Sequence, residues 1–132
     1  MQNKIWRAVR WLFGAFYLIS GVHFSLVFAG ILPKPGFGLS SASAAFQDAL
    51  AATGFVVPLL FLTYIVSGAL MLRERTAPLG IVILAPVMVI IFFTNTLLDH
   101  AWIWGCGNTL ILAALAWQFR SAFIPLWNYR AD

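Results

Sequence analysis

The sequence predicts an all-α integral membrane protein: a four-helix bundle with a short interfacial helix in its first outer loop. Of the 132 residues, 62% are hydrophobic and only 9% are charged, a composition typical of membrane proteins. Residues 77–98 contain no charged side chain. At the α-helical rise this run spans about 33 Å, enough to cross a hydrocarbon core of roughly 30 Å.

Three further apolar segments accompany this run, so residues 1–132 are expected to form a single transmembrane domain. The four predicted spans are residues 11–32, 55–72, 77–98 and 101–119. Pro33 should stop the first helix because proline cannot continue the hydrogen-bond ladder. Residues 73–75 form a basic turn before the third span. Pro86 predicts a kink in that span, and Arg120 followed by Pro125 predicts the end of the fourth.

The outer loop from Gly36 to Gly54 is long enough to contain a helix. Ser40 or Ser41 is a suitable N-cap, and Gly54 a suitable end. The apolar face would consist of Ala42, Ala45, Phe46, Ala49, Leu50 and Thr53. The polar face would consist of Ser43, Gln47 and Asp48. We therefore expect a short helix at the membrane surface, with an ordinary ordered loop as the alternative.

The basic residues predict the orientation of the chain. Seven of the eight lie in the N-terminal segment, in the 73–75 turn or in the C-terminal tail, and Lys34 alone lies on the other side. Cytoplasmic loops carry the excess of Lys and Arg. We therefore expect a bacterial inner-membrane protein with both termini in the cytoplasm. The net charge of +4 is too dispersed to favour a nucleic-acid partner.

Small residues recur at a spacing of four in two spans. The two stripes are Gly21, Ser25 and Ala29, and Gly105, Thr109 and Ala113. Such stripes let helices approach closely in lipid. They are predicted contact surfaces for a neighbouring helix.

Polar residues within the spans predict a cluster in the outer half of the bundle. Counted from the outer ends of their spans, His23 and Tyr64 lie about 13 Å deep and Asn108 about 10 Å deep. Polar groups left unpaired in hydrocarbon are costly, so these three should turn inward and meet. Each has a structural alternative: a packing histidine for His23, and interhelical hydrogen bonds for Tyr64 and Asn108.

Asn95, Asp99 and His100 are expected to form the outer mouth of this cluster. Asn95 and Asp99 share a helix face at a spacing of four, and His100 follows directly. For Asn95 the alternative is an interhelical hydrogen bond. For Asp99 and His100 it is a solvated turn in which Asp99 caps the fourth helix.

No catalytic or metal-binding motif accompanies the cluster. The sequence has no phosphate-binding glycine loop, Cys-x-x-Cys, His-Glu-x-x-His or nucleophile elbow. His23 and His100 lie at different depths, which argues against a shared haem or metal ion. Cys106 is the one cysteine and is expected to be a packing residue. We predict no catalytic residue and no metal.

Five segments together resemble the DoxX-like family of small membrane proteins. They are residues 10–14, 20–23, 51–60, 84–89 and 119–126. The resemblance covers nearly the whole chain and implies a four-helix bundle. Some family members are subunits of quinone-reducing oxidoreductases, and others are accessory proteins. The chain departs from the family pattern at Tyr64, Ile90 and Asn95, where many relatives have glutamate, asparagine and histidine.

Two functions of different classes are compatible with these observations. The first is an accessory protein that stabilises or recruits a membrane partner, or a second copy of itself, through the stripes and the outer loop. The second is a small subunit of a membrane oxidoreductase, in which His23 or Tyr64 donates a hydrogen bond to a quinone that supplies the redox chemistry. Small-molecule or lipid binding or transport is a third, although a bundle this small has little room for alternating access.

Overall fold

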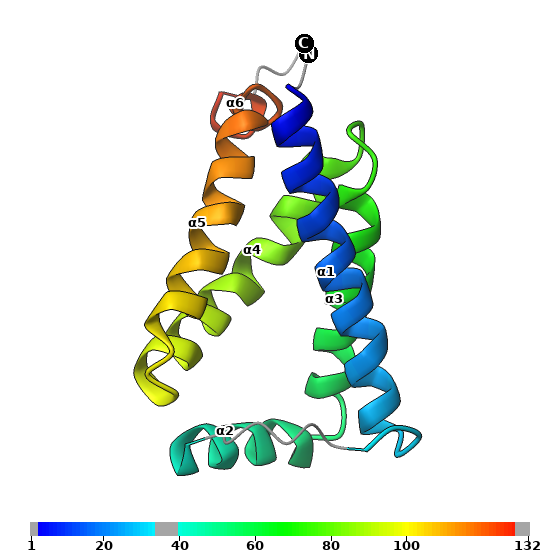
Figure 1. Cartoon of the computed structure of the whole chain (residues 1–132), viewed down its shortest axis with the longest axis vertical. Helices are drawn as coiled ribbons and strands as arrows, with labels where there is room; N and C mark the ends of the chain where they lie inside the picture. Colours follow the sequence, from blue (N-terminus) through cyan, green and yellow to red (C-terminus); the bar gives the residue numbers. More distant parts are fainter. Residues whose placement is uncertain (1–2, 34–39, 129–132) are drawn as a thin grey trace.

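The computed structural model describes residues 3–33 and 40–128, and every regular element in them is helical (Figure 1). The elements are α1 (Lys4–Phe28), α2 (Ser41–Ala52), α3 (Val56–Met71), α4 (Ala77–Phe93), the π-helical turn η1 (Thr94–Leu98), α5 (Trp102–Gln118) and α6 (Arg120–Trp127). The predicted all-α class is confirmed. Lys34, Gly36 and Arg130, which entered the predicted loop and topology, lie outside the described residues.

Two to four of these helices are long and apolar enough to cross a membrane. α1 meets the requirement alone, and so does the continuous segment Ala77–Leu98 formed by α4 and η1. α3 and α5 meet it only together with the helix across a sharp bend, of 97° between α2 and α3 and of 78° between α5 and α6. These lengths are consistent with integration into a membrane.

α1 begins and ends earlier than the predicted first span. It starts at Lys4, because basic side chains near a membrane surface can extend a helix and still reach water. It ends at Phe28 rather than at Pro33. Gly30 has a φ of +80°, the left-handed conformation that commonly follows a helix end, and its N–H bonds the Val27 carbonyl.

The fourth span ends close to its predicted bound, because α5 stops at Gln118. What the prediction lacked is the helix that follows, since Arg120 and Pro125 both lie within α6, beyond a bend of 78°. The guanidinium of Arg120 donates to the Trp117 carbonyl at 3.0 Å and stacks over the Trp117 ring at 5.0 Å. These two contacts satisfy the C-terminal end of α5 and turn the chain into a short, largely exposed helix.

Side chains at the end of α4 explain the change to π-helical pairing. Thr94, Asn95 and Thr96 each donate a hydrogen bond to the carbonyl four residues earlier, at 2.7 to 2.9 Å. Such bonds compete with the regular ladder and bend a helix. α4 itself continues through Pro86 without a break.

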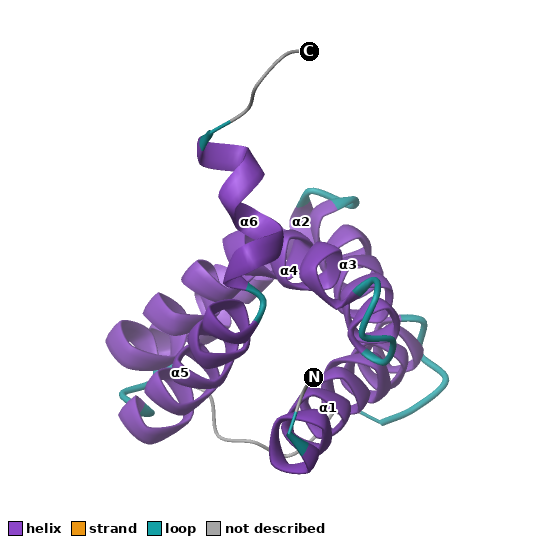
Figure 2. Ribbon diagram, turned by 90° about the horizontal axis from the view of Figure 1, so that it is seen from above, coloured by secondary structure: helices purple, strands orange, loops and turns teal. Residues whose placement is uncertain are grey.

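The helices follow an arc (Figure 2). α1 packs most extensively against α3, α3 against α4, and α4 against α5, whereas α1 and α5 make few contacts with each other. α2 lies across the end of the molecule opposite the termini (Figure 1) and contacts α3 and η1.

Glycines set the close contacts along this arc. A Cβ added to Gly68 of α3 would lie 2.6 Å from both the Gly14 carbonyl oxygen and the Leu18 nitrogen of α1. A Cβ added to Gly80 of α4 would lie 2.8 Å from the Ser67 carbonyl oxygen of α3. The backbones meet with no side chain between them, as tight helix pairs in lipid do.

The predicted stripes are only partly buried. A Cβ added to Gly21 would lie 2.8 Å from Ile65 Cγ1 of α3, and one added to Gly105 would lie 3.1 Å from Asn95 Cβ of η1, so both glycines pack closely on a neighbouring helix. The last members, Ala29 and Ala113, are exposed. The glycines of the stripes therefore hold this chain's own helices together.

Arg10 closes the α1–α3 contact at the end nearest the termini. Its side chain is buried and donates to the Met71 carbonyl of α3 at 2.6 Å. A cation at the C-terminal end of a helix is favoured because it compensates the unpaired carbonyls and the helix dipole.

Candidate functional site

Tyr17 lies where four helices meet. Its hydroxyl donates to Asn108 Oδ1 of α5 at 3.3 Å and lies 3.9 Å from Met88 Sδ of α4. Its ring packs edge-on against Tyr64 of α3, with the centroids 5.4 Å apart. Only 3% of Tyr17 is exposed. We define the central polar cluster as Tyr17, Tyr64, Met88 and Asn108.

Within the cluster, Asn108 and Tyr64 differ in how well they are hydrogen-bonded. Asn108 is buried, and its amide nitrogen donates to the Trp104 carbonyl at 2.9 Å while its oxygen accepts from Tyr17. The hydroxyl of the half-buried Tyr64 has no hydrogen-bond partner within residues 3–33 and 40–128. One phenol hydroxyl of the cluster is therefore left without a hydrogen bond to the described residues.

His23 does not join this cluster, and the expectation that it turns inward is wrong. The buried face of α1 consists of Arg10, Phe13, Gly14, Tyr17 and Gly21. His23 follows Gly21 by two residues, a rotation of about 200° around the helix. It is exposed, and its ring packs edge-on against that of Phe24.

Tyr17 takes the place that the sequence analysis gave to His23. The depth of a residue in the membrane does not fix its rotational position around the helix, which decides whether its side chain faces inward. The seven-residue spacing from Arg10 to Tyr17, and from Gly14 to Gly21, was the available signal, because residues seven apart lie on one helix face. Tyr64 and Asn108 do lie beside Tyr17, as members of the predicted cluster.

Asp99 binds the N-terminus of α2. Its Oδ1 accepts hydrogen bonds from the Ser40 backbone N–H at 3.3 Å and from the Ser40 hydroxyl at 3.2 Å, and its Oδ2 accepts from the Ser43 hydroxyl at 3.0 Å. Ser40 Oγ also accepts from the Ser43 N–H at 3.1 Å, as an N-cap does. The carboxylate faces the positive end of the helix dipole, which favours it. We call these three residues the α2 anchor.

α2 confirms the predicted helix in this loop, and its place at the membrane surface stays a prediction. The α2 anchor corrects two details, the exposure of Ser43 and the cap of the fourth span. Ser40 is the cap, and Gly54, with a φ of +80°, follows the helix end. Ser43 is fully buried rather than part of a solvent face, because its hydroxyl pairs with Asp99. Asp99 does not cap the fourth span, since α5 has Ala101 at its N-cap and no side-chain cap bond.

Asn95 and His100 do not form a mouth with Asp99. The Asn95 amide donates to the Ile91 carbonyl of its own helix at 2.9 Å, and its Cβ packs against Gly105. His100 is exposed in the turn before α5, with a φ of +54°. Of the three predicted residues, only Asp99 has a side-chain hydrogen bond to another element within the described part of the chain.

No group of three or more His, Cys, Asp or Glu residues that could hold a metal ion occurs among the described residues. No protein-family model, curated protein or solved structure matches this chain. The resemblance to DoxX-like proteins therefore stays a prediction, supported by the sequence segments alone.

Proposed function

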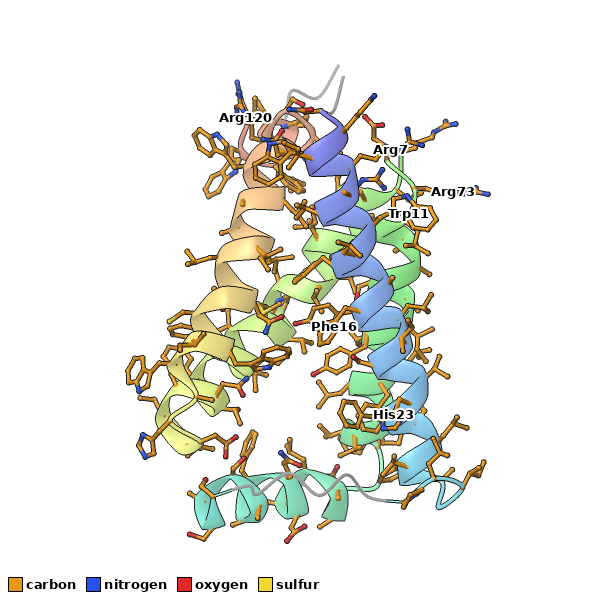
Figure 3. All side chains as sticks on the ribbon, in the orientation of Figure 1. Arg7, Trp11, Phe16, His23, Arg73 and Arg120 are labelled. Atoms are coloured by element: carbon orange, nitrogen blue, oxygen red, sulfur yellow. The ribbon has the colours of Figure 1, made fainter. Side chains whose placement is uncertain are left out.

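We propose that this chain crosses the bacterial inner membrane four times, as a four-helix bundle with both termini in the cytoplasm. α1, α3, α4 with η1, and α5 correspond to the four predicted spans. Arg7, Arg73 and Arg120 lie at one end of the molecule and α2 at the other (Figure 3). The excess of basic residues favours the cytoplasm for that end.

Thiol labelling tests this orientation. In a Cys106→Ser background, Gln47→Cys on the exposed side of α2 should react with an impermeant reagent in intact cells. A cysteine added after Asn128 should react only after lysis. The opposite pattern would reverse the orientation.

We propose further that the protein is an accessory protein that binds a membrane partner along the edge between α1 and α5. The observation that best supports this is the loose closure of that edge. Phe16 and Trp104 meet there edge-on at 5.7 Å, and 40% and 53% of their surfaces are exposed. Aromatic rings that are partly free offer a large and rigid contact area.

This edge replaces the stripes as the proposed partner surface. The glycines of the stripes are already used between helices of this chain. Ile111 lies seven residues after Trp104 and so on the same face of α5, and 39% of it is exposed. Leu110 is rotated from it by about 100° and is 68% exposed, which makes it a matched control.

Photo-cross-linking in cells tests the accessory function. A benzophenone amino acid at Ile111 should give a protein adduct, and the same group at Leu110 should give mainly lipid adducts. An adduct of twice the chain mass identifies a second copy as the partner. Equal protein adducts at both positions, or none at Ile111, would contradict the proposal.

A second candidate function is binding of a quinone at the central polar cluster, as in a small oxidoreductase subunit. The specific observation is the Tyr64 hydroxyl, which has no partner among the described residues and suits a carbonyl acceptor. A bound quinone would supply the redox chemistry, and the chain's residues would orient it.

Binding of a short-chain ubiquinone analogue to the purified chain, followed by quenching of tryptophan fluorescence, tests this function. Tyr64→Phe should weaken binding roughly three- to tenfold, the effect of one lost neutral hydrogen bond. Thr63→Val is the control, because its hydroxyl already donates to the Leu59 carbonyl at 2.9 Å. Equal affinities for the two variants would exclude Tyr64 as the donor.

A further inference from the structure

The N-terminal part of α1 carries a shallow pocket, open to the surface, beside its packing surface against α3. The pocket has a volume of about 290 Å³ and is lined by Lys4, Arg7, Ala8 and Trp11. These positions follow one another at spacings of three, one and three residues, so they lie on one side of the helix. The buried Arg10 is rotated by about 100° from Trp11 around the helix and donates to α3 instead.

The two cations of this pocket are free to bind an anion. Lys4 and Arg7 are both exposed, and neither has a hydrogen-bond or ion-pair partner within the described part of the chain. No acidic residue lines the pocket, and the small Ala8 leaves space beside Lys4 and Arg7. Lys and Arg together suit a phosphate group, Arg through its planar fork and Lys as a point charge.

The residues that follow on this face suit an acyl chain. Trp11 lies about one turn further into the span than Arg7, at the level where tryptophan belts occur, and 50% of the residue is exposed. Ile19 and Val22 continue the same face and are 67% and 44% exposed. The order of two cations, an interfacial ring and exposed aliphatic side chains matches the order of headgroup, boundary and tail in a lipid. This order favours a phospholipid over a free phosphate or an acidic protein.

We propose that Lys4, Arg7 and Trp11 form a binding site for the phosphate headgroup of an anionic phospholipid in the leaflet nearest the termini. Lys4 and Arg7 bind the phosphate, and Trp11 lies at the boundary between headgroup and chains. The site is independent of the α1–α5 edge and of the central polar cluster.

Native mass spectrometry of the full chain tests this site. The protein is released from vesicles of phosphatidylcholine that also contain phosphatidylglycerol, and the retained lipid is identified. Wild-type protein should retain phosphatidylglycerol in preference to phosphatidylcholine. Lys4→Gln with Arg7→Gln should lower its retention roughly ten- to thirtyfold, the effect of removing two basic residues near an anionic surface.

Two control variants separate a built site from general charge. Arg73→Gln with Arg75→Gln makes the same charge change at exposed positions outside the pocket and should alter retention less than about twofold. Lys4→Arg with Arg7→Lys keeps both charges and should retain the lipid. Equal losses in the two glutamine pairs would overturn the proposal, because retention would then follow net charge.

Two further outcomes would overturn it. Displacement of phosphatidylglycerol by excess inorganic phosphate would mark a site for a free anion. A wild-type protein that retains phosphatidylglycerol no better than phosphatidylcholine would also contradict the proposal. An acidic protein would then be the expected ligand of the pocket.

Discussion

α1 contacts α3 and α5 in different ways, extensively with the first and at few points with the second. Against α3, Gly14, Gly21 and Gly68 bring the backbones together. Against α5, the contact consists chiefly of the Phe16–Trp104 ring pair and the Tyr17–Asn108 hydrogen bond. In lipid, burial of apolar surface drives helix association only weakly, so close backbone packing supplies most of the stability. The α1–α3 contact is therefore expected to be permanent, and the α1–α5 contact adaptable.

The largest expected effect comes from filling the α1–α3 contact. Gly68→Leu should prevent stable folding, at a cost above about 3 kcal/mol, because the new side chain would meet backbone atoms that cannot move aside. The midpoint of thermal unfolding in mild detergent, followed by size-exclusion chromatography, measures this. Gly107→Ala is the control, since an added Cβ there meets nothing within 4 Å, and it should be neutral or slightly stabilising. Equal midpoints for the two variants would remove the contrast between the contacts.

A smaller effect is expected at the α2 anchor, which joins α2 to the α4–α5 side of the arc. Asp99→Ala removes the acceptor of three hydrogen bonds and should cost about 1–3 kcal/mol, mostly as local release of α2. Hydrogen exchange of the Ser41–Ala52 amides should then accelerate while that of α3 stays unchanged. Asp48→Ala, an exposed acid on α2 itself, is the matched control. Unchanged exchange in Asp99→Ala would show that other contacts hold α2.

The smallest effect is expected for the hydrogen bond of the α1–α5 contact. Tyr17→Phe should destabilise the protein by only about 0.6 kcal/mol, the average for interhelical hydrogen bonds in membranes. Tyr64→Phe should change stability less, because its hydroxyl bonds no described residue. The test compares the midpoints of thermal unfolding of Tyr17→Phe, of Tyr64→Phe and of the double variant that combines Tyr17→Phe with Asn108→Ala. A loss for Tyr17→Phe as large as that for Gly68→Leu would make the two contacts equivalent.

Local signals in the sequence predicted the helices well, because their causes are local. An uncharged apolar run must become helical in lipid to pair its backbone groups, which accounts for Ala77–Leu98. Ser40 as a cap and Gly54 after the helix end depend on the chain only a few residues away. The early end of α1 has a local cause too, since Gly30 follows Phe28 by two residues and precedes Pro33, the predicted stop.

The composition and order of the residues by themselves determined that the chain is helical, how long its apolar helices are and which polar residues lie along them. Only the tertiary structure decided which face of each helix is inside. In a soluble protein the apolar stripe marks the buried face, but in lipid both faces are apolar, and exposed Leu12, Ile19 and Val22 lie on the same helix as buried Phe13 and Tyr17. The choice of Tyr17 over His23, and the pairing of Asp99 with Ser43 across 56 residues, depend on where the neighbouring helices stand. That position is set by glycine contacts between distant segments. A seven-residue spacing such as that of Gly14 and Gly21 marks one face of a helix but does not tell which helix packs on it.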